Sequence, residues 1–123
     1  QMNISSILDV QNHHGYAVVR FFGFLDADTV EQARPVVNAK LSEACATIIV
    51  DLSHVEFLDS HGVGFFTSLL KKAHQRGGRL FFVGATAQPA SVLNMVGFNG
   101  SLVTYCDDLS AAITKFSAQQ GAC

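Results

Sequence analysis

The stretch ATIIVDLSHVEFLDSHGVGFF, residues 46–66, places a buried strand shortly before an amphipathic helix. Residues 46–52 are a short, β-branched, continuously apolar run, which is typical of a parallel strand covered on both faces. The segment SHVEFLD follows as a connector, and a helix is predicted from about His61. Its inward positions follow helical spacing, namely Val63, Phe66, Leu70 and Ala73. A buried strand followed by such a helix indicates an α/β fold.

Toward the N-terminus, the pattern predicts two strands joined in a hairpin and then a helix. Residues 2–10 alternate between apolar and polar positions, and Gly15 joins them to the apolar run YAVVRFFGF, residues 16–24. Asp28, with a glutamate three residues later, is predicted to cap the helix that follows. Pro35 lies inside the helical pattern and indicates a kink or a late start.

Toward the C-terminus, the pattern predicts two more strands and two more helices. The strands are RLFFVG and SLVTY; a short helix between them ends at Gly97, and Asp107 or Asp108 caps a last helix. The element order is therefore β-β-α-β-α-β-α-β-α, which predicts one domain over residues 1–123 with a small, mixed, mostly parallel central sheet flanked by helices. The tail, residues 117–123, is expected to fray.

Composition narrows the possible functions. The 123 residues are 49% hydrophobic and 15% charged, with a net charge of -2, which excludes a disordered chain and disfavours nucleic-acid binding. No apolar run is long enough to span a membrane, and the first residues lack the pattern of a signal peptide. Three cysteines form no disulfide framework. We therefore expect a soluble, cytoplasmic protein without membrane insertion.

Motifs for catalysis, metal binding and cofactor binding are missing from the sequence. No two of the five histidines are four residues apart, and no cysteine stands at ligand spacing beside them. The GVG at residues 62–64 lacks the lysine and hydroxyl residue of a phosphate-binding loop, and Ser60 is not in a GxSxG motif. The sequence therefore predicts a protein that is not an enzyme and needs neither a metal nor a cofactor.

Asp59 and Ser60 stand between the buried strand and the following helix, and two interpretations fit them. Either residue can cap the helix by accepting a hydrogen bond from its first turn. The same position also suits a regulatory phosphate on Ser60, because a helix N-terminus favours negative charge. A phosphoserine there would be a fixed surface charge that could block a docking partner.

The segment DLSHVEFLDSHGVGFF, residues 51–66, closely resembles the signature of the STAS domain family, and specifically of bacterial anti-sigma factor antagonists. Further segments are similar to other family motifs: GFLDADT (23–29), RGGRLFFVGA (76–85) and VLNMVGF (92–98). The resemblance covers about residues 4–116. It implies a small central sheet flanked by helices, in agreement with the predicted element order.

The resemblance also implies a function centred on Ser60. In this family, the serine directly after the motif's aspartate is phosphorylated, and Ser60 occupies that position. The unphosphorylated protein binds an anti-sigma factor that is itself an ATP-dependent serine protein kinase. Phosphorylation releases this partner, and a PP2C-type phosphatase restores binding.

By position in the family motifs, Asp26 and Asp59 are expected to lie at the same end of the sheet and to contribute to docking. His61 and Gly62 follow Ser60 and are expected to share this surface, and Phe65 is expected to be partly exposed on it. His61 departs from the family pattern, in which a serine or threonine is usual at this position. A second phosphorylation within the motif is therefore not expected.

Two other functions remain open. The chain could be a constitutive STAS subunit of a lipid-transport complex or of a large stress-sensing assembly, with the serine acting only as a cap. It could instead sense a small ligand or a nucleotide with the loop ends near Asp26 and Ser60. A phosphatase-insensitive complex would indicate the first function, and stabilisation by a ligand without any partner would indicate the second.

Overall fold

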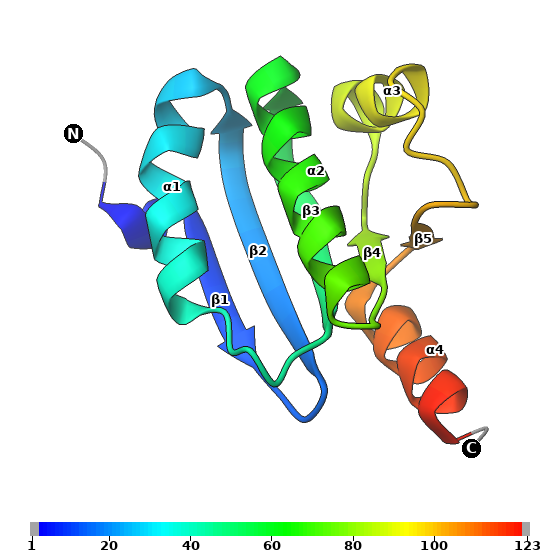
Figure 1. Ribbon diagram of the computed structural model, residues 1–123. Helices are drawn as coiled ribbons and strands as arrows, with labels where there is room; N and C mark the ends of the chain where they lie inside the picture. The colour runs from blue at the N-terminus through cyan, green and yellow to red at the C-terminus, as the bar shows by residue number, and fades with distance from the viewer. Residues whose placement is uncertain (1–2, 122–123) are drawn as a thin grey trace.

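The computed structural model describes residues 3–121 and contains one five-stranded sheet with helices on both faces (Figure 1). The strands are β1 (Leu8–Asn12), β2 (Tyr16–Leu25), β3 (Thr47–Leu58), β4 (Leu80–Val83) and β5 (Thr104–Cys106). The helices are α1 (Ala27–Lys40), α2 (Ser60–Gln75), α3 (Ala87–Met95) and α4 (Leu109–Gly121), with a 3-10 turn, η1 (Ile4–Ser6), before β1. This order confirms the predicted element order and fold class.

The sheet follows the chain, with the strands side by side in the order β1-β2-β3-β4-β5. β1 and β2 are antiparallel and joined at Gly15, whose φ of 88° lies in the region that favours glycine. All later neighbours are parallel, each reached by a helical crossover. β2 and β3 end together, because Leu25 is opposite Leu58 in their register. The carboxyl ends of the two strands therefore place the starts of α1 and α2 next to each other.

The two faces of the sheet carry separate apolar clusters. Val19, Ile48 and Phe82 pack with residues of α1, α2 and α3, whereas their chain neighbours Val18 and Ile49 pack against α4. Successive strand residues point to opposite faces, so α4 covers the face opposite the other three helices. This explains why the strands are apolar on both sides.

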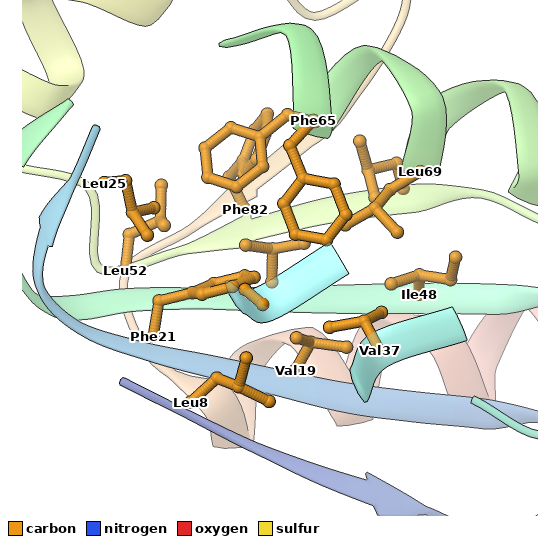
Figure 2. Packing of buried hydrophobic residues seen from close by; sticks show 14 of the residues in the cluster. Leu8, Val19, Phe21, Leu25, Val37, Ile48, Leu52, Phe65, Leu69 and Phe82 are labelled. Carbon is orange, nitrogen blue, oxygen red and sulfur yellow. The ribbon is translucent and has the colours of Figure 1, made fainter. Parts of the chain in front are cut away.

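The larger cluster is built around phenylalanine rings. Phe21 of β2 lies edge-on to Phe65 of α2, with 5.9 Å between ring centroids, and Phe66 packs on Phe82 of β4 at 5.2 Å. Figure 2 shows Phe65 and Leu69 of α2 above the strand side chains. All of these side chains are fully buried. They fix the position of α2 on the sheet, and with it the position of Ser60.

Two predicted boundaries near strands are wrong. Residues 4–6 form η1 and β1 begins at Leu8, so the alternation in this part of the predicted first strand does not reflect a strand; Met2 lies outside the described residues. The predicted connector after residue 52 is the second half of β3. Two shifts in the register with β2 leave Leu52, Val55 and Leu58 buried. The burial therefore repeats every third residue and conceals the strand's normal period of two.

The ends of α1 and α4 also differ from the sequence prediction. α1 begins at Ala27 with Asp26 as its N-cap, so Asp28 is not the cap and Pro35 does not delay the start. α4 begins after Asp108, whose Oδ1 accepts from the Ala111 N–H at 2.8 Å, as expected. It continues to Gly121 through most of the segment expected to fray. Cys123 lies outside the described residues.

Within residues 3–121, no helix combines the length and the hydropathy that a membrane crossing requires. The two cysteines in this range are free thiols. Cys45 is buried, and its Sγ lies 3.2 Å from the carbonyl oxygen of Tyr16, which places it in the hairpin end of the core.

Candidate functional site

The candidate site lies at the carboxyl ends of β2 and β3, at the top of the view in Figure 1. The backbone N–H of Asp59 donates to the carbonyl oxygen of Leu25 at 3.2 Å, so the two strand ends are hydrogen-bonded directly. Asp26 and Asp59 each follow the last residue of their strand and each cap a helix. The structure thus brings together the two aspartates that the sequence expects at one end of the sheet.

Asp26 is held in a reciprocal capping box with Thr29. Its Oδ1 accepts from the Thr29 backbone N–H at 3.1 Å, and its own N–H donates to Thr29 Oγ1 at 3.0 Å. The Thr29 hydroxyl in turn donates to the carbonyl oxygen of Phe24 at 2.7 Å. The hydrogen bond from Thr29 is the main reason that the pKa of Asp26 is lowered. Asp26, which the sequence analysis expected only as a docking residue, is therefore also the N-cap of α1.

Asp59 caps α2, whereas Ser60 does not. Asp59 Oδ1 accepts from the His61 N–H at 2.8 Å and from the Gly62 N–H at 3.4 Å. The same oxygen lies 3.4 Å from Nδ1 of the His61 ring, whose side chain is 58% exposed. The sequence left the cap open between Asp59 and Ser60, and the structure assigns it to Asp59.

Ser60 is the first residue of α2 and is exposed. Within residues 3–121, no hydrogen bond to its Oγ is found, because the neighbouring carboxylate already accepts from the free N–H groups of the first turn. Its hydroxyl is therefore open to solvent at a helix N-terminus, where the backbone carries partial positive charge. Chemically, Ser60 offers an exposed hydroxyl that no other described group holds.

Gly62 and Phe65 are part of the core instead of the surface. A Cβ on Gly62 would lie 2.2 Å from Cδ1 of Leu58 and 3.2 Å from the carbonyl oxygen of Leu25. Phe65 is fully buried, with the Arg34 guanidinium 4.9 Å from its ring centroid. The expected partial exposure of Phe65 is wrong, because the ring turns inward to meet Phe21. Both residues support the site from below.

The DLS triplet at the middle of β3 has a structural role. Asp51 is buried, and its carboxylate accepts from Ser53 Oγ at 2.7 Å, from the Ser53 N–H at 3.0 Å and from Arg20 Nε at 2.9 Å. Burial raises the pKa of Asp51, but the hydrogen bonds from Ser53 and the nearby Arg20 outweigh it, so the net shift is downward. This paired charge links β2 to β3 below the site.

Two residues near the site were missed by the sequence analysis. The side-chain amide of Gln88 in α3 accepts from the Leu58 N–H at 2.9 Å and donates to the Leu58 carbonyl oxygen at 2.8 Å. Phe24 is 53% exposed and packs on Phe57, with 5.5 Å between ring centroids. The doubly apolar run of β2 was a signal for Phe24, whereas nothing local in the sequence indicates the role of Gln88. Among the described residues, no group of metal-ligating side chains is found.

Comparisons with known proteins agree with this architecture. The family model of the STAS domain matches residues 8–112. An anti-sigma F factor antagonist of Paenibacillus polymyxa is 25% identical over 105 residues, which cover 85% of this chain and 90% of the relative. A putative anti-sigma factor antagonist of Thermotoga maritima has a similar structure, with a TM-score of 0.77, 20% identity and coverage of 88% and 92% of the two chains. The Bacillus cell fate determinant SpoIIAA in its phosphorylated form superposes with a TM-score of 0.70 at 24% identity, covering 89% and 98%.

Proposed function

Because the chain belongs to the STAS domain family, we propose that it is an anti-sigma factor antagonist whose binding to its partner is released by phosphorylation of Ser60. One observation carries this proposal: the Ser60 hydroxyl is exposed and uncommitted at the start of α2, while Asp59 alone caps the helix. A serine needed as a cap could not be modified without cost to the helix. Here Asp59 caps the helix, and Ser60 is left for the proposed phosphorylation.

The start of α2 can accommodate a phosphate. The helix dipole favours a negative group at this end, whereas the adjacent Asp59 carboxylate, which already accepts from the N–H groups of His61 and Gly62, opposes it. The phosphate adds about 1.5 to 2 negative charges at pH 7, which roughly doubles the net charge of -2. The change is therefore large for this chain, yet it falls on a surface position outside the core.

The docking surface in this proposal comprises Asp26, Asp59, Ser60 and His61. These residues lie at one end of the sheet on two adjacent helix starts, so a partner that reaches Ser60 also meets both carboxylates. A phosphate at Ser60 places a third negative group among them. We infer that its charge and bulk separate a partner that the unphosphorylated surface holds.

The partner is proposed to be an anti-sigma factor with serine protein kinase activity, and a PP2C-type phosphatase reverses its action. In the forward step, the Ser60 hydroxyl gives up its proton to a base of the kinase and its Oγ bonds to the γ-phosphorus of ATP. The bond from this phosphorus to the oxygen that bridges to the β-phosphate breaks, and ADP leaves. The chain is thus a substrate and a binding module, without a catalytic step of its own. The names of its relatives and the phosphorylated form of SpoIIAA support this role, and we place it in the cytoplasm on the same basis.

Serine variants test the proposal directly. The wild-type chain, Ser60→Ala and Ser60→Asp are each incubated with the cognate kinase and ATP, and phosphate uptake is measured by intact mass. Ser60→Ala is expected to take up no phosphate and to bind the anti-sigma factor, whereas Ser60→Asp binds at least about tenfold more weakly. Ser110→Ala is the matched control, because Ser110 is an exposed serine on α4, on the opposite face of the sheet.

Two outcomes would contradict the proposal. If Ser60→Ala still accepted phosphate, the modified residue would be elsewhere. If Ser60→Asp bound as tightly as the wild type and phosphatase treatment of the native protein changed nothing, the chain would be a constitutive subunit. Ser110→Ala must behave as the wild type in both assays.

A further inference from the structure

The charges of this chain are divided unevenly along its length. Residues 60–106 hold four of the eight lysine and arginine residues and none of the ten aspartate and glutamate residues. All four of these cations fall within residues 71–79, at the end of α2 and in the turn that leads to β4. The rest of the chain carries the other four cations against all ten acids. A chain with a net charge of -2 thus contains a cationic segment, residues 71–79, and the acidic Glu43 lies on the loop 42–45 that Arg76 contacts.

A cavity of about 360 Å³ lies beside this cationic segment, between the α2–β4 turn and the loop that leads into β5. The cavity is at the amino ends of β4 and β5 and at the C-terminal end of α2. Ser60 is at the other end of α2, away from the cavity. Its polar lining side chains are His74, Arg79, Ser101 and Thr104, and no acidic residue is among its lining residues. The volume is within the range of sites for small ligands.

Arg76 and Lys72 form hydrogen bonds with other parts of the chain, and Lys71 is not among the residues that line the cavity. His74 and Arg79 are exposed side chains that line it. Arg76 donates to the carbonyl oxygens of Ser42 and Cys45 at 3.1 and 3.0 Å, and Lys72 donates to an asparagine on α1. In contrast, no hydrogen bond or ion pair of the Arg79 guanidinium or the His74 ring is found within residues 3–121. Arg79 presents a planar set of donors that matches a phosphate.

The turn that forms one wall is fixed by close backbone contacts. Gly77 has a φ of 75°, and a Cβ on Gly78 would lie 2.2 Å from the carbonyl oxygen of Ala46. The last carbonyls of α2 carry partial negative charge, which would disfavour an anion. Those of Ala73 and His74 already accept from the N–H groups of Gly78 and Gly77, at 2.8 and 3.1 Å. This wall of the cavity is therefore fixed by the backbone, and hydrogen bonds partly offset the negative charge of the last α2 carbonyls.

We propose that this cavity binds a small phosphate monoester, with Arg79 as its principal contact and His74 beside it. A single phosphate would fill only part of the volume, so the ligand carries a further small body, such as a sugar. The site is independent of Ser60 and of the partner-binding role, because it uses the opposite end of α2.

Titration followed by backbone amide chemical shifts tests the site. Ribose 5-phosphate, inorganic phosphate and ribose are added separately to the full chain at constant ionic strength. Ribose 5-phosphate is expected to shift the amides of residues 77–79 and 100–104 in a saturable way, with weaker binding of phosphate and none of ribose. Arg79→Gln keeps much of the side-chain length and is expected to weaken binding about tenfold or more.

Lys40→Gln provides the matched control, since Lys40 is an exposed cation in the last turn of α1 and is not part of the cavity lining. Unchanged binding by this variant supports a site at Arg79. Equal weakening by Arg79→Gln and Lys40→Gln would overturn the proposal, as would shifts spread over the whole surface. Binding to vesicles containing phosphatidic acid without any saturable response to ribose 5-phosphate would also overturn it, in favour of a lipid surface.

Discussion

The starts of α1 and α2 are both capped by an aspartate, Asp26 and Asp59, and differ at the third helical position. In α1 this position is Thr29, whose hydroxyl accepts from the Asp26 N–H and completes the capping box. In α2 it is Gly62, which has no side chain to return the bond. The Asp59 N–H donates instead to the carbonyl oxygen of Leu25, on the neighbouring strand.

The comparison shows how two adjacent helix starts can be capped in different ways. The start of α1 has a complete capping box, and the start of α2 has only the aspartate cap. The start of α1 is satisfied by its own residues, whereas the start of α2 is satisfied partly by the sheet. The sheet contact leaves no room for a side chain at Gly62, and the first helical residue, Ser60, has no structural bond to make. Chemical modification at this helix start can therefore leave the cap intact.

Filling the space at Gly62 should have the largest effect on stability. Gly62→Ala forces a methyl group against the buried Leu58 side chain and is expected to lower the free energy of unfolding by about 1–3 kcal/mol in urea denaturation. Gly64→Ala is the matched control in the same helix: nothing lies within 4 Å of its Cβ, and it should gain up to about 1 kcal/mol. Equal stability of Gly62→Ala and wild type would refute the close contact.

Removing the capping box of α1 is expected to have the next largest effect on stability. Asp26→Ala removes the acceptor of the Thr29 N–H and should cost about 1 kcal/mol of unfolding free energy. Asp26→Asn retains a capping oxygen and should cost only a few tenths. Chemical denaturation of the three proteins measures this order, and a larger loss for Asn than for Ala would contradict the capping role.

Truncating the side chain of Ser60, the first residue of α2, should have almost no effect on stability. Ser60→Ala removes a hydroxyl without a hydrogen-bond partner in the described chain, and the free energy of unfolding should stay within about 0.5 kcal/mol of wild type. Thermal and urea denaturation both measure it. A loss of more than 1 kcal/mol would mean that Ser60 contributes to the cap, contrary to the structure.

Lowering the pH should gradually remove the stabilisation that the Asp26 cap gives to α1. The pKa of Asp26 is lower in the folded protein than its ordinary value of 3.8, so the folded state binds this proton less readily than the unfolded state. Its contribution to stability is fully present above about pH 4 to 5 and is lost as the pH falls through the folded pKa. Urea midpoints between pH 5 and pH 2.5 should therefore fall less steeply for Asp26→Asn. Parallel curves for the two proteins would show that the cap does not titrate.

The element order could be predicted because each strand and helix carries its own pattern. The cap of α1 could not, since Asp26 with Thr29 and Asp28 with Glu31 have the same spacing and both fit a helix start. The deciding factor is where β2 ends, which depends on the pairing of Leu25 with Leu58. That pairing joins residues distant in the sequence.

The candidate site was predicted in position and only partly in composition. Asp26, Asp59, Ser60 and His61 lie where the sequence placed them, because the ends of parallel strands converge. Phe65 was misplaced, since helical periodicity fits either of two adjacent rings, and only the packing of Phe21 decides that both are buried.

The amide clasp between Gln88 and Leu58 has a further consequence for the edge of β3. β4 pairs only with residues 48–51, so the second half of β3 extends beyond its neighbouring strand, and α3 contacts β3 instead. An open strand edge is a template on which another chain can add a strand. Gln88 occupies the N–H and carbonyl of Leu58 as a residue of an adjoining strand would. The last N–H and carbonyl groups of β3 on this side are therefore not available to a strand from another molecule.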